Sequence, residues 1–144
     1  MTTYVFNPFT GTLDADSGAT IPSNVRVRTV GGTAYNGGSA LTTGKIKGYF
    51  TVPYSGTITA WSIGVDAGTA TMTTWKVATG TATPTVANSI STSGVSISTG
   101  TYVRSTTTSD FTTTTVSAND IFAFNISAVS TATELTFQLE ITAT

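Results

Sequence analysis

The chain contains no cysteine and no histidine among its 144 residues. Without cysteine there is no disulfide, no thiolate nucleophile and no cysteine-type zinc site. Without histidine there is no Ser–His–Asp triad and no Cys–His pair, and most transition-metal sites lose their usual ligand. The sequence therefore predicts no catalytic residue of these classes, no metal site and no cofactor.

Charged residues are also scarce, with six Lys and Arg, seven Asp and Glu, and a net charge of −1. This balance removes the electrostatic basis for binding nucleic acid or an anionic membrane. No apolar run approaches the roughly 20 residues that a membrane helix needs, and the first residues do not resemble a secretory signal. Because a dispersed monomer normally carries more charge, we expect a protein covered by copies of itself or by a partner.

Carboxylate chemistry remains open, since two acidic side chains suffice for glycoside hydrolysis. The acidic residues fall mostly at predicted turns or strand ends, where Asp commonly accepts backbone hydrogen bonds, and no spacing places two of them together. They are Asp14, Asp16, Asp66, Asp110, Asp120, Glu134 and Glu140. A calcium-loop pattern starts at Asp14 but fails, because Ala19 and Val25 stand where glycine and glutamate are needed. We expect a protein that is not an enzyme.

What is abundant is threonine, with 35 residues, together with 15 serines. Threonine is β-branched and suits a pleated, half-exposed surface. Short runs with period-two alternation recur along the chain, and no long helix is credible. These features predict an all-β fold, a single two-sheet β-sandwich of jelly-roll type over residues 24–144, preceded by an extended N-terminal arm over residues 1–23.

The stretch 49–77 holds both tryptophans and reads as two strands joined by Asp66-Ala67-Gly68, a connector with hairpin turn chemistry. Further strands are expected at 25–30, 45–52, 120–126 and 135–142. A flexible loop is expected at 31–44, and one helical turn with Thr83 at its N-cap and Pro84 at N1 is possible. Residues 91–118 are read as loops and short strands. The expected core consists of Phe50, Trp61, Trp75, Phe122, Phe124 and Phe137.

The arm is the candidate interaction segment, because Tyr4, Phe6 and Phe9 place three aromatic residues within nine positions. Two outcomes are open. The arm can dock as an edge strand on the sheet of its own chain, or it can pack on a neighbouring subunit. A second candidate surface is a carbohydrate-binding face built on exposed tyrosines, for which Tyr35, Tyr49, Tyr54 and Tyr102 are available.

Several stretches resemble a β-sandwich module of tailed-bacteriophage virion proteins. They are GYFTVPYSGTITAW at 48–61, WKV at 75–77, PTVANSI at 84–90 and DIFAFN at 120–125. The opening YVFNPFTGTLD at 4–14 is similar to the first residues of many phage virion proteins. Asn88 and Thr74 depart from the module, which often has acidic residues at these two positions.

The resemblance implies a virion structural protein. A single domain with a short arm suits a capsid decoration (cement) protein on the head surface, assembled in the host cytoplasm. Its partners would be the major capsid protein, other virion proteins and copies of itself, as a trimer. The alternative is a small tail or tail-fibre component, an adhesin that recognises a host surface glycan.

Overall fold

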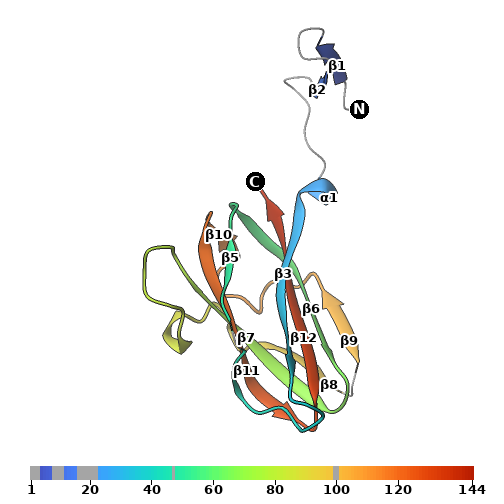
Figure 1. Cartoon of the computed structure of the whole chain (residues 1–144), viewed down its shortest axis with the longest axis vertical. Coiled ribbons are helices and arrows are strands. Elements are labelled where there is room, and N and C mark those ends of the chain that lie inside the picture. Colours follow the sequence, from blue (N-terminus) through green and yellow to red (C-terminus); the bar gives the residue numbers. More distant parts are fainter. Residues whose placement is uncertain (1–3, 8–11, 16–22, 47, 99–100) are drawn as a thin grey trace.

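The computed structural model describes residues 4–7, 12–15, 23–46, 48–98 and 101–144, with side chains from residue 25 onward. Its main body is a β-sandwich of two antiparallel sheets, as the threonine-rich sequence predicts (Figure 1). The elements follow in this order: β1 Tyr4–Asn7, β2 Thr12–Ala15, α1 Ser23–Arg26, β3 Val27–Tyr35, β4 Gly44–Lys45, β5 Phe50–Val52, β6 Gly56–Val65, β7 Thr69–Val77, the 3-10 turn η1 Val86–Asn88, β8 Val95–Ser98, β9 Tyr102–Ser105, β10 Thr115–Val116, β11 Asp120–Ser130 and β12 Glu134–Ala143.

The first sheet has the order β10–β6–β12–β3, and β9 also pairs with β6. The second sheet has the order β4–β11–β7–β8, and β5 also pairs with β11. One edge of each sheet is therefore shared by two short strands. The jelly-roll-like sandwich that the sequence predicts is confirmed.

Strand β12 lies at the centre of the first sheet and follows the predicted alternation. Leu135, Phe137, Leu139 and Ile141 are fully buried, and they face the second sheet. Phe124 on β11 meets Phe137 edge-on, with ring centroids 5.1 Å apart, and so joins the two sheets. Each such side chain contributes about 1.5–3 kcal/mol through burial, which makes this contact the centre of the core.

The expected hairpin at Asp66–Gly68 is wrong. Strands β6 and β7 do follow each other through this turn, but β6 pairs with β12 in the first sheet and β7 pairs with β11 in the second. The turn therefore carries the chain from one sheet to the other. Its geometry needs glycine, because Gly68 has φ +63° and a Cβ there would collide with the Ser130 carbonyl oxygen. Turn chemistry marks where a chain reverses, and long-range packing selects the partner strand.

Trp75 does not belong to the core, contrary to the sequence expectation. Ala70, Met72 and Thr74 point into the sandwich, so Trp75 lies half-buried on the outer face of the second sheet. Trp61, Phe122, Phe124 and Phe137 are buried core residues, and Phe50 packs partly buried against them. Alternation groups Trp75 with the threonines of its own face, but it does not say which face points inward.

The strand expected at 25–30 begins two residues later and extends well into the expected loop. After the single turn of α1, β3 continues through Gly31 and Gly32 to Tyr35 and pairs with β12 along its whole length. Glycine is needed there because a Cβ at Gly31 would collide with the Phe137 carbonyl oxygen, and one at Gly32 would lie 3.1 Å from the Phe50 ring. Close approach, and not flexibility, explains these two glycines.

Two smaller expectations also change. The strand expected at 45–52 is divided into β4 and β5, with Gly48 at φ +106° between them. The helical turn near Pro84 is η1, which follows Thr85 instead of Thr83. The amide oxygen of Asn88 accepts hydrogen bonds from the backbone N–H and the hydroxyl of Thr85, so this position still carries a polar contact.

The arm contains a hairpin of its own. Strands β1 and β2 pair with each other and form a separate two-stranded sheet. In Figure 1 this hairpin stands beyond the end of the sandwich at which β3 begins. Phe9 lies outside the described residues, and the described part of Tyr4 and Phe6 is their backbone in β1. The domain boundary at residue 23 stays a prediction.

Candidate functional site

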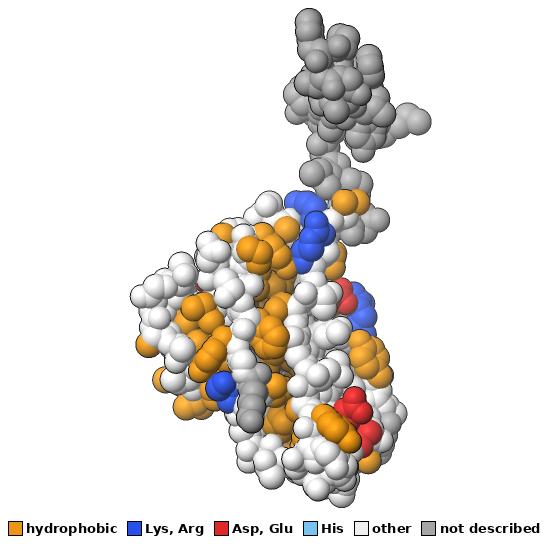
Figure 2. Space-filling model, viewed as in Figure 1, with side chains coloured by type: hydrophobic (Ala, Val, Ile, Leu, Met, Phe, Trp, Pro, Cys, Tyr) orange, Lys and Arg blue, Asp and Glu red, His pale blue; other side chains and the backbone are white. Residues whose placement is uncertain are grey.

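One long side of the sandwich is open. Here the edge strand β3 of the first sheet faces β4 and β5 of the second, and within the described ranges β3 pairs only with β12. Figure 2 shows a band of hydrophobic side chains along this side, between β3 and the β4–β5 region. Partly buried hydrophobic residues of these elements, among them Val30, Ala34, Leu41 and Phe50, pack against the core here. We call this opening the β3 groove.

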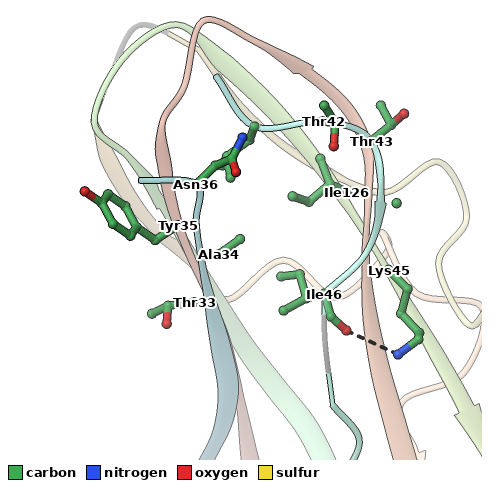
Figure 3. A pocket seen from close by; sticks show the side chains of 11 residues that line it. Thr33, Ala34, Tyr35, Asn36, Thr42, Thr43, Lys45, Ile46 and Ile126 are labelled. Atoms are coloured by element: carbon green, nitrogen blue, oxygen red, sulfur yellow. Dashed lines mark hydrogen bonds between the residues drawn. The ribbon is translucent and has the colours of Figure 1, made fainter. Parts of the chain in front are cut away.

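The β3 groove widens into a pocket of about 450 Å³ at the end where β3 stops. Ala34, Leu41, Ile46 and Ile126 supply its apolar lining, and threonine hydroxyls surround them. Figure 3 shows Ala34, Ile46 and Ile126 directed toward the space between β3 and β4, whereas Tyr35 and Lys45 point away from it. The dimensions suit one large apolar side chain or a small group of atoms.

The sequence around the β3 groove carries charge of one sign. Residues 23–52 include Arg26, Arg28, Lys45 and Lys47, four of the six basic residues, and no acidic residue. The arm, residues 1–22, carries Asp14 and Asp16 and no basic residue. Arg28 donates to the carbonyl oxygens of Val25 and Val27, at 2.7 and 3.0 Å, which leaves its positive charge unpaired by any carboxylate of the described part. The segment that forms the two borders of the β3 groove therefore carries only positive charge, and the floor of the groove is apolar.

A second surface lies on the outer face of the first sheet, where two of the four candidate tyrosines are found. Tyr102 on β9 is 61 % exposed, and its ring leans over β6 at Gly64, where a Cβ would lie 2.8 Å from Cδ2. Thr136 and Glu134 of β12 border the same hollow. Tyr35, 69 % exposed, stands opposite Glu134 on β3. We call this surface the tyrosine trough.

The other two tyrosines lie elsewhere and have different neighbours. Tyr49 is exposed beside β5, with the Lys45 ammonium 4.3 Å from its ring centroid. Tyr54 is partly buried against the core, and this burial raises the pKa of its phenol. The structure therefore does not bring the four candidate tyrosines together on one face.

Two acidic residues of the described part, Asp66 and Glu140, are held by neighbouring residues. Asp66 accepts hydrogen bonds from the hydroxyl and backbone N–H of Thr133 and from the N–H of Glu134, and these bonds lower the pKa of its carboxyl to about 2. Glu140 accepts two hydrogen bonds from Arg104, which lower the pKa of the glutamate. These bonds give Asp66 and Glu140 structural roles.

The remaining acidic residues are distributed differently. Asp120 is buried, and its Oδ2 lies 2.7 Å from Lys76 Nζ. Asp14 lies in β2, and Asp16 lies outside the described residues. No group of three or more metal-binding side chains occurs in the described ranges. None of the helices described there is long and apolar enough to cross a membrane.

Sequence reasoning missed the β3 groove. Ala34, Leu41, Ile46 and Ile126 are common core residues, and the first two stand in a stretch that reads as a glycine-rich loop. The one available signal was the run of four basic residues without an acid between positions 23 and 52. The unpaired edge of β3 leaves no trace in the sequence because it depends on where distant strands lie.

No family model matches the chain, and no curated protein matches it. Among solved structures, the chain is similar to the cupin domain of Drosophila melanogaster CENP-C, with 7% identity, 98% of this chain and 78% of that chain covered, and a TM-score of 0.27. It is also similar to the Tobacco streak virus coat protein dimer, with 12% identity, 86% and 89% covered, and a TM-score of 0.33. Likenesses at this level assign no function to the chain.

Proposed function

We propose that the protein is a non-enzymatic structural component of a bacteriophage virion, a capsid decoration protein that binds the head shell and neighbouring copies. The observation that carries the proposal is the β1–β2 hairpin, which forms a sheet separate from both sheets of the sandwich. A two-stranded hairpin is at best marginally stable alone in water. A hairpin that carries Tyr4 and Phe6 therefore gains stability by binding another surface.

Composition supports the same function. A net charge of −1 and a threonine-rich surface suit a protein that spends its life packed against others, on the outside of a particle assembled in the host cytoplasm. The resemblance of residues 48–61, 75–77, 84–90 and 120–125 to phage virion modules points to the same class. In this proposal Tyr4, Phe6 and Phe9 contact the shell or a neighbouring copy, and the sandwich forms a trimer that faces outward.

Copy number in purified particles tests the location. A decoration protein is present in hundreds of copies per particle, and a dozen copies or fewer would contradict the proposal. Removal of residues 1–12 should abolish binding to the shell while the sandwich still folds, as followed by co-sedimentation and circular dichroism. A full-length Tyr49→Ala variant is the matched control, because Tyr49 is an exposed aromatic of the sandwich outside the arm.

The alternative function, a small tail or tail-fibre adhesin for a host surface glycan, is favoured by the tyrosine trough. Tyr102 leans on Gly64 and remains exposed, so its ring is held in place for contact with a sugar. A carbohydrate array tests this function directly. Binding should be lost in Tyr102→Ala and kept in Tyr49→Ala. If the protein binds no glycan of the array, the adhesin function is excluded.

A further inference from the structure

The first observation is the unequal protection of the sheet edges. Strand β3 presents nine residues along one edge, whereas β4, β5, β8, β9 and β10 present two to four residues each. Exposed edge strands offer unpaired N–H and C=O groups to another strand, and proteins commonly protect them by keeping them short or by placing proline or lysine on them. Strand β3 contains no proline and no lysine. It is the edge best suited to accept an added strand.

The second observation is the floor beside that edge. An added strand that pairs with the edge at Thr33–Tyr35 would place alternate side chains toward the second sheet. That direction leads to the pocket lined by Ala34, Leu41, Ile46 and Ile126 (Figure 3). Strand addition gains affinity from backbone hydrogen bonds and specificity from pockets for alternate side chains. The β3 groove provides both features.

The third observation identifies the occupant. The arm has aromatic residues at period two in its sequence, Tyr4 and Phe6, within the extended segment β1, and Val5 and Asn7 alternate with them. Its charged side chains are Asp14 and Asp16, which are opposite in sign to the four basic residues of the segment 23–52. The arm of the same chain stands beyond the opposite end of β3 in Figure 1, away from the pocket. The arm of a second copy is the same segment, and it does not have to start from the far end of β3.

We propose that the N-terminal segment of one copy adds as a strand to the free edge of β3 in a second copy and places an aromatic side chain in the pocket between β3 and β4. Each copy then gives an arm and receives an arm. Such a head-to-tail contact closes into a ring when the rotation between copies allows it, which is consistent with a trimer. The inference rests on the proposed assembly function and names the surface that the arm binds.

The absence of native cysteine gives a direct test. Copies carrying only Phe6→Cys are mixed with copies carrying only Ala34→Cys and oxidised, and the product is analysed on a non-reducing gel. We expect a disulfide-linked dimer of the two different copies. Two matched pairs should give at least about tenfold less product. The first is Asn7→Cys with Ala34→Cys, because neighbouring residues of a strand point to opposite faces and Asn7 follows Phe6. The second is Phe6→Cys with Val103→Cys, because Val103 lies on β9 at the other edge of the first sheet.

Equal yields from all three pairs, or no cross-link from the first, would overturn the proposal. So would a doubly substituted chain, with Phe6→Cys and Ala34→Cys together, that forms only an internal disulfide at every concentration. The assay uses no capsid and leaves the proposed function open to separate test. If shell binding requires residues 1–12 while the cross-link fails, the decoration function holds and the arm binds the shell instead of β3.

A second measurement avoids cysteine altogether. Phe6→Asp should weaken self-association by about tenfold or more in sedimentation velocity, as expected when a buried aromatic anchor is lost. Asn7→Asp adds the same charge on the opposite face and should have a much smaller effect. Because the arm and the groove carry opposite charges, higher salt should weaken association of the unchanged protein as well. A chain that stays monomeric at all concentrations would refute the inference.

Discussion

The two long sides of the sandwich differ in how the chain covers the core between the sheets. On the closed side, where β9 and β10 form the edge of the first sheet and β8 the edge of the second, residues 105–114 bond to the first sheet and to the segment 90–92, which itself bonds to β7. Ile58 N–H in the first sheet donates to the Thr114 carbonyl oxygen, and Thr112 N–H donates to the Ile90 carbonyl oxygen after β7. The indole of Trp61 donates to the Thr107 carbonyl oxygen at 2.8 Å, and the Phe111 side chain of this segment is buried in the core. We call residues 105–114 the closing segment.

On the open side, the loop between β3 and β4 passes from the first sheet to the second at one end of the β3 groove. Leu41 N–H donates to the Ala132 carbonyl oxygen, and Ile46 N–H donates to the Phe124 carbonyl oxygen. Beyond that loop, Val30 and Phe50 lie at the opening and remain only partly buried. The difference teaches that this chain covers one side of its core with its own backbone and leaves the other side available to another chain.

The largest expected effect compares one phenylalanine from each side. Phe111→Ala removes the buried ring by which the closing segment packs on the core and should lower the free energy of unfolding by about 3–4 kcal/mol. Phe50→Ala removes a partly exposed ring on the open side and should cost only about 2 kcal/mol. Urea unfolding of the two variants measures both values. A cost at Phe50 equal to that at Phe111 would mean that the two sides are equally closed.

The next effect concerns the indole N–H groups. Trp61→Phe removes the hydrogen bond to the Thr107 carbonyl oxygen and should cost about 1 kcal/mol more than Trp75→Phe. Trp75 is the matched control because its Nε1 is buried without a hydrogen-bond partner in the described part. Thermal unfolding of both variants gives the comparison. Equal costs would show that the bond to Thr107 does not hold the closing segment.

Acid should weaken the contacts of Asp66 and Glu140 before it affects the segment 23–52, which contains no acidic residue. The ionised form of Asp66 holds Thr133 and Glu134, and its pKa is about 2 in the folded protein against 3.8 for the free side chain. Its contribution to stability is therefore complete above about pH 4–5 and is lost as the pH falls toward 2. The Arg104–Glu140 pair on β9 and β12 also lowers the pKa of its carboxyl, so its contribution to stability is likewise lost as the pH falls.

This pH dependence can be followed residue by residue. Amide hydrogen exchange between pH 5 and pH 2, corrected for the intrinsic rate, should rise first at Thr133 and Glu134. The segment 23–52 contains no acidic residue and should change least. An Asp66→Asn variant should show a smaller change at Thr133 over the same range. Protection lost first along β3 would contradict the assignment of these contacts.

The smallest expected effect is that of the arm on the isolated sandwich. A chain that lacks residues 1–22 should keep its free energy of unfolding within about 0.5 kcal/mol at low concentration, because neither sheet includes β1 or β2. At high concentration the full-length chain should be the more stable, since association stabilises the folded state by mass action. Scanning calorimetry at two concentrations separates these effects. A large loss at low concentration would show that the arm completes its own sandwich.

Much of the fold could be predicted from local patterns. The alternation in 135–142 and 120–126 correctly identified the buried faces of β12 and β11, because successive side chains of a strand point to opposite faces. Position 75 shows the limit of this reasoning. The strand is predicted correctly, but both faces of β7 carry threonine beside larger apolar residues, so the pattern does not select the face that packs against the first sheet.

The candidate surfaces were less predictable. The arm was visible as three aromatics in nine residues, and the exposed Tyr35 and Tyr102 were among the tyrosines considered. The pocket of the β3 groove was not visible, since its lining comes from β3, the loop after it, the segment around β4 and β11. Gly31 and Gly32 were read as a loop because a close approach between strands cannot be seen in one strand alone.

The sequence by itself determined the all-β class, the absence of cysteine and histidine chemistry, the two-residue period of each strand and the aromatic arm. These properties are local, because they depend on residue type and on neighbours along the chain. Only the tertiary structure decided that β6 and β7 lie in different sheets, that Trp75 faces outward and that β3 keeps a free edge. Those outcomes depend on contacts between residues far apart in sequence, which compete for the same core and are settled only when the whole sandwich packs.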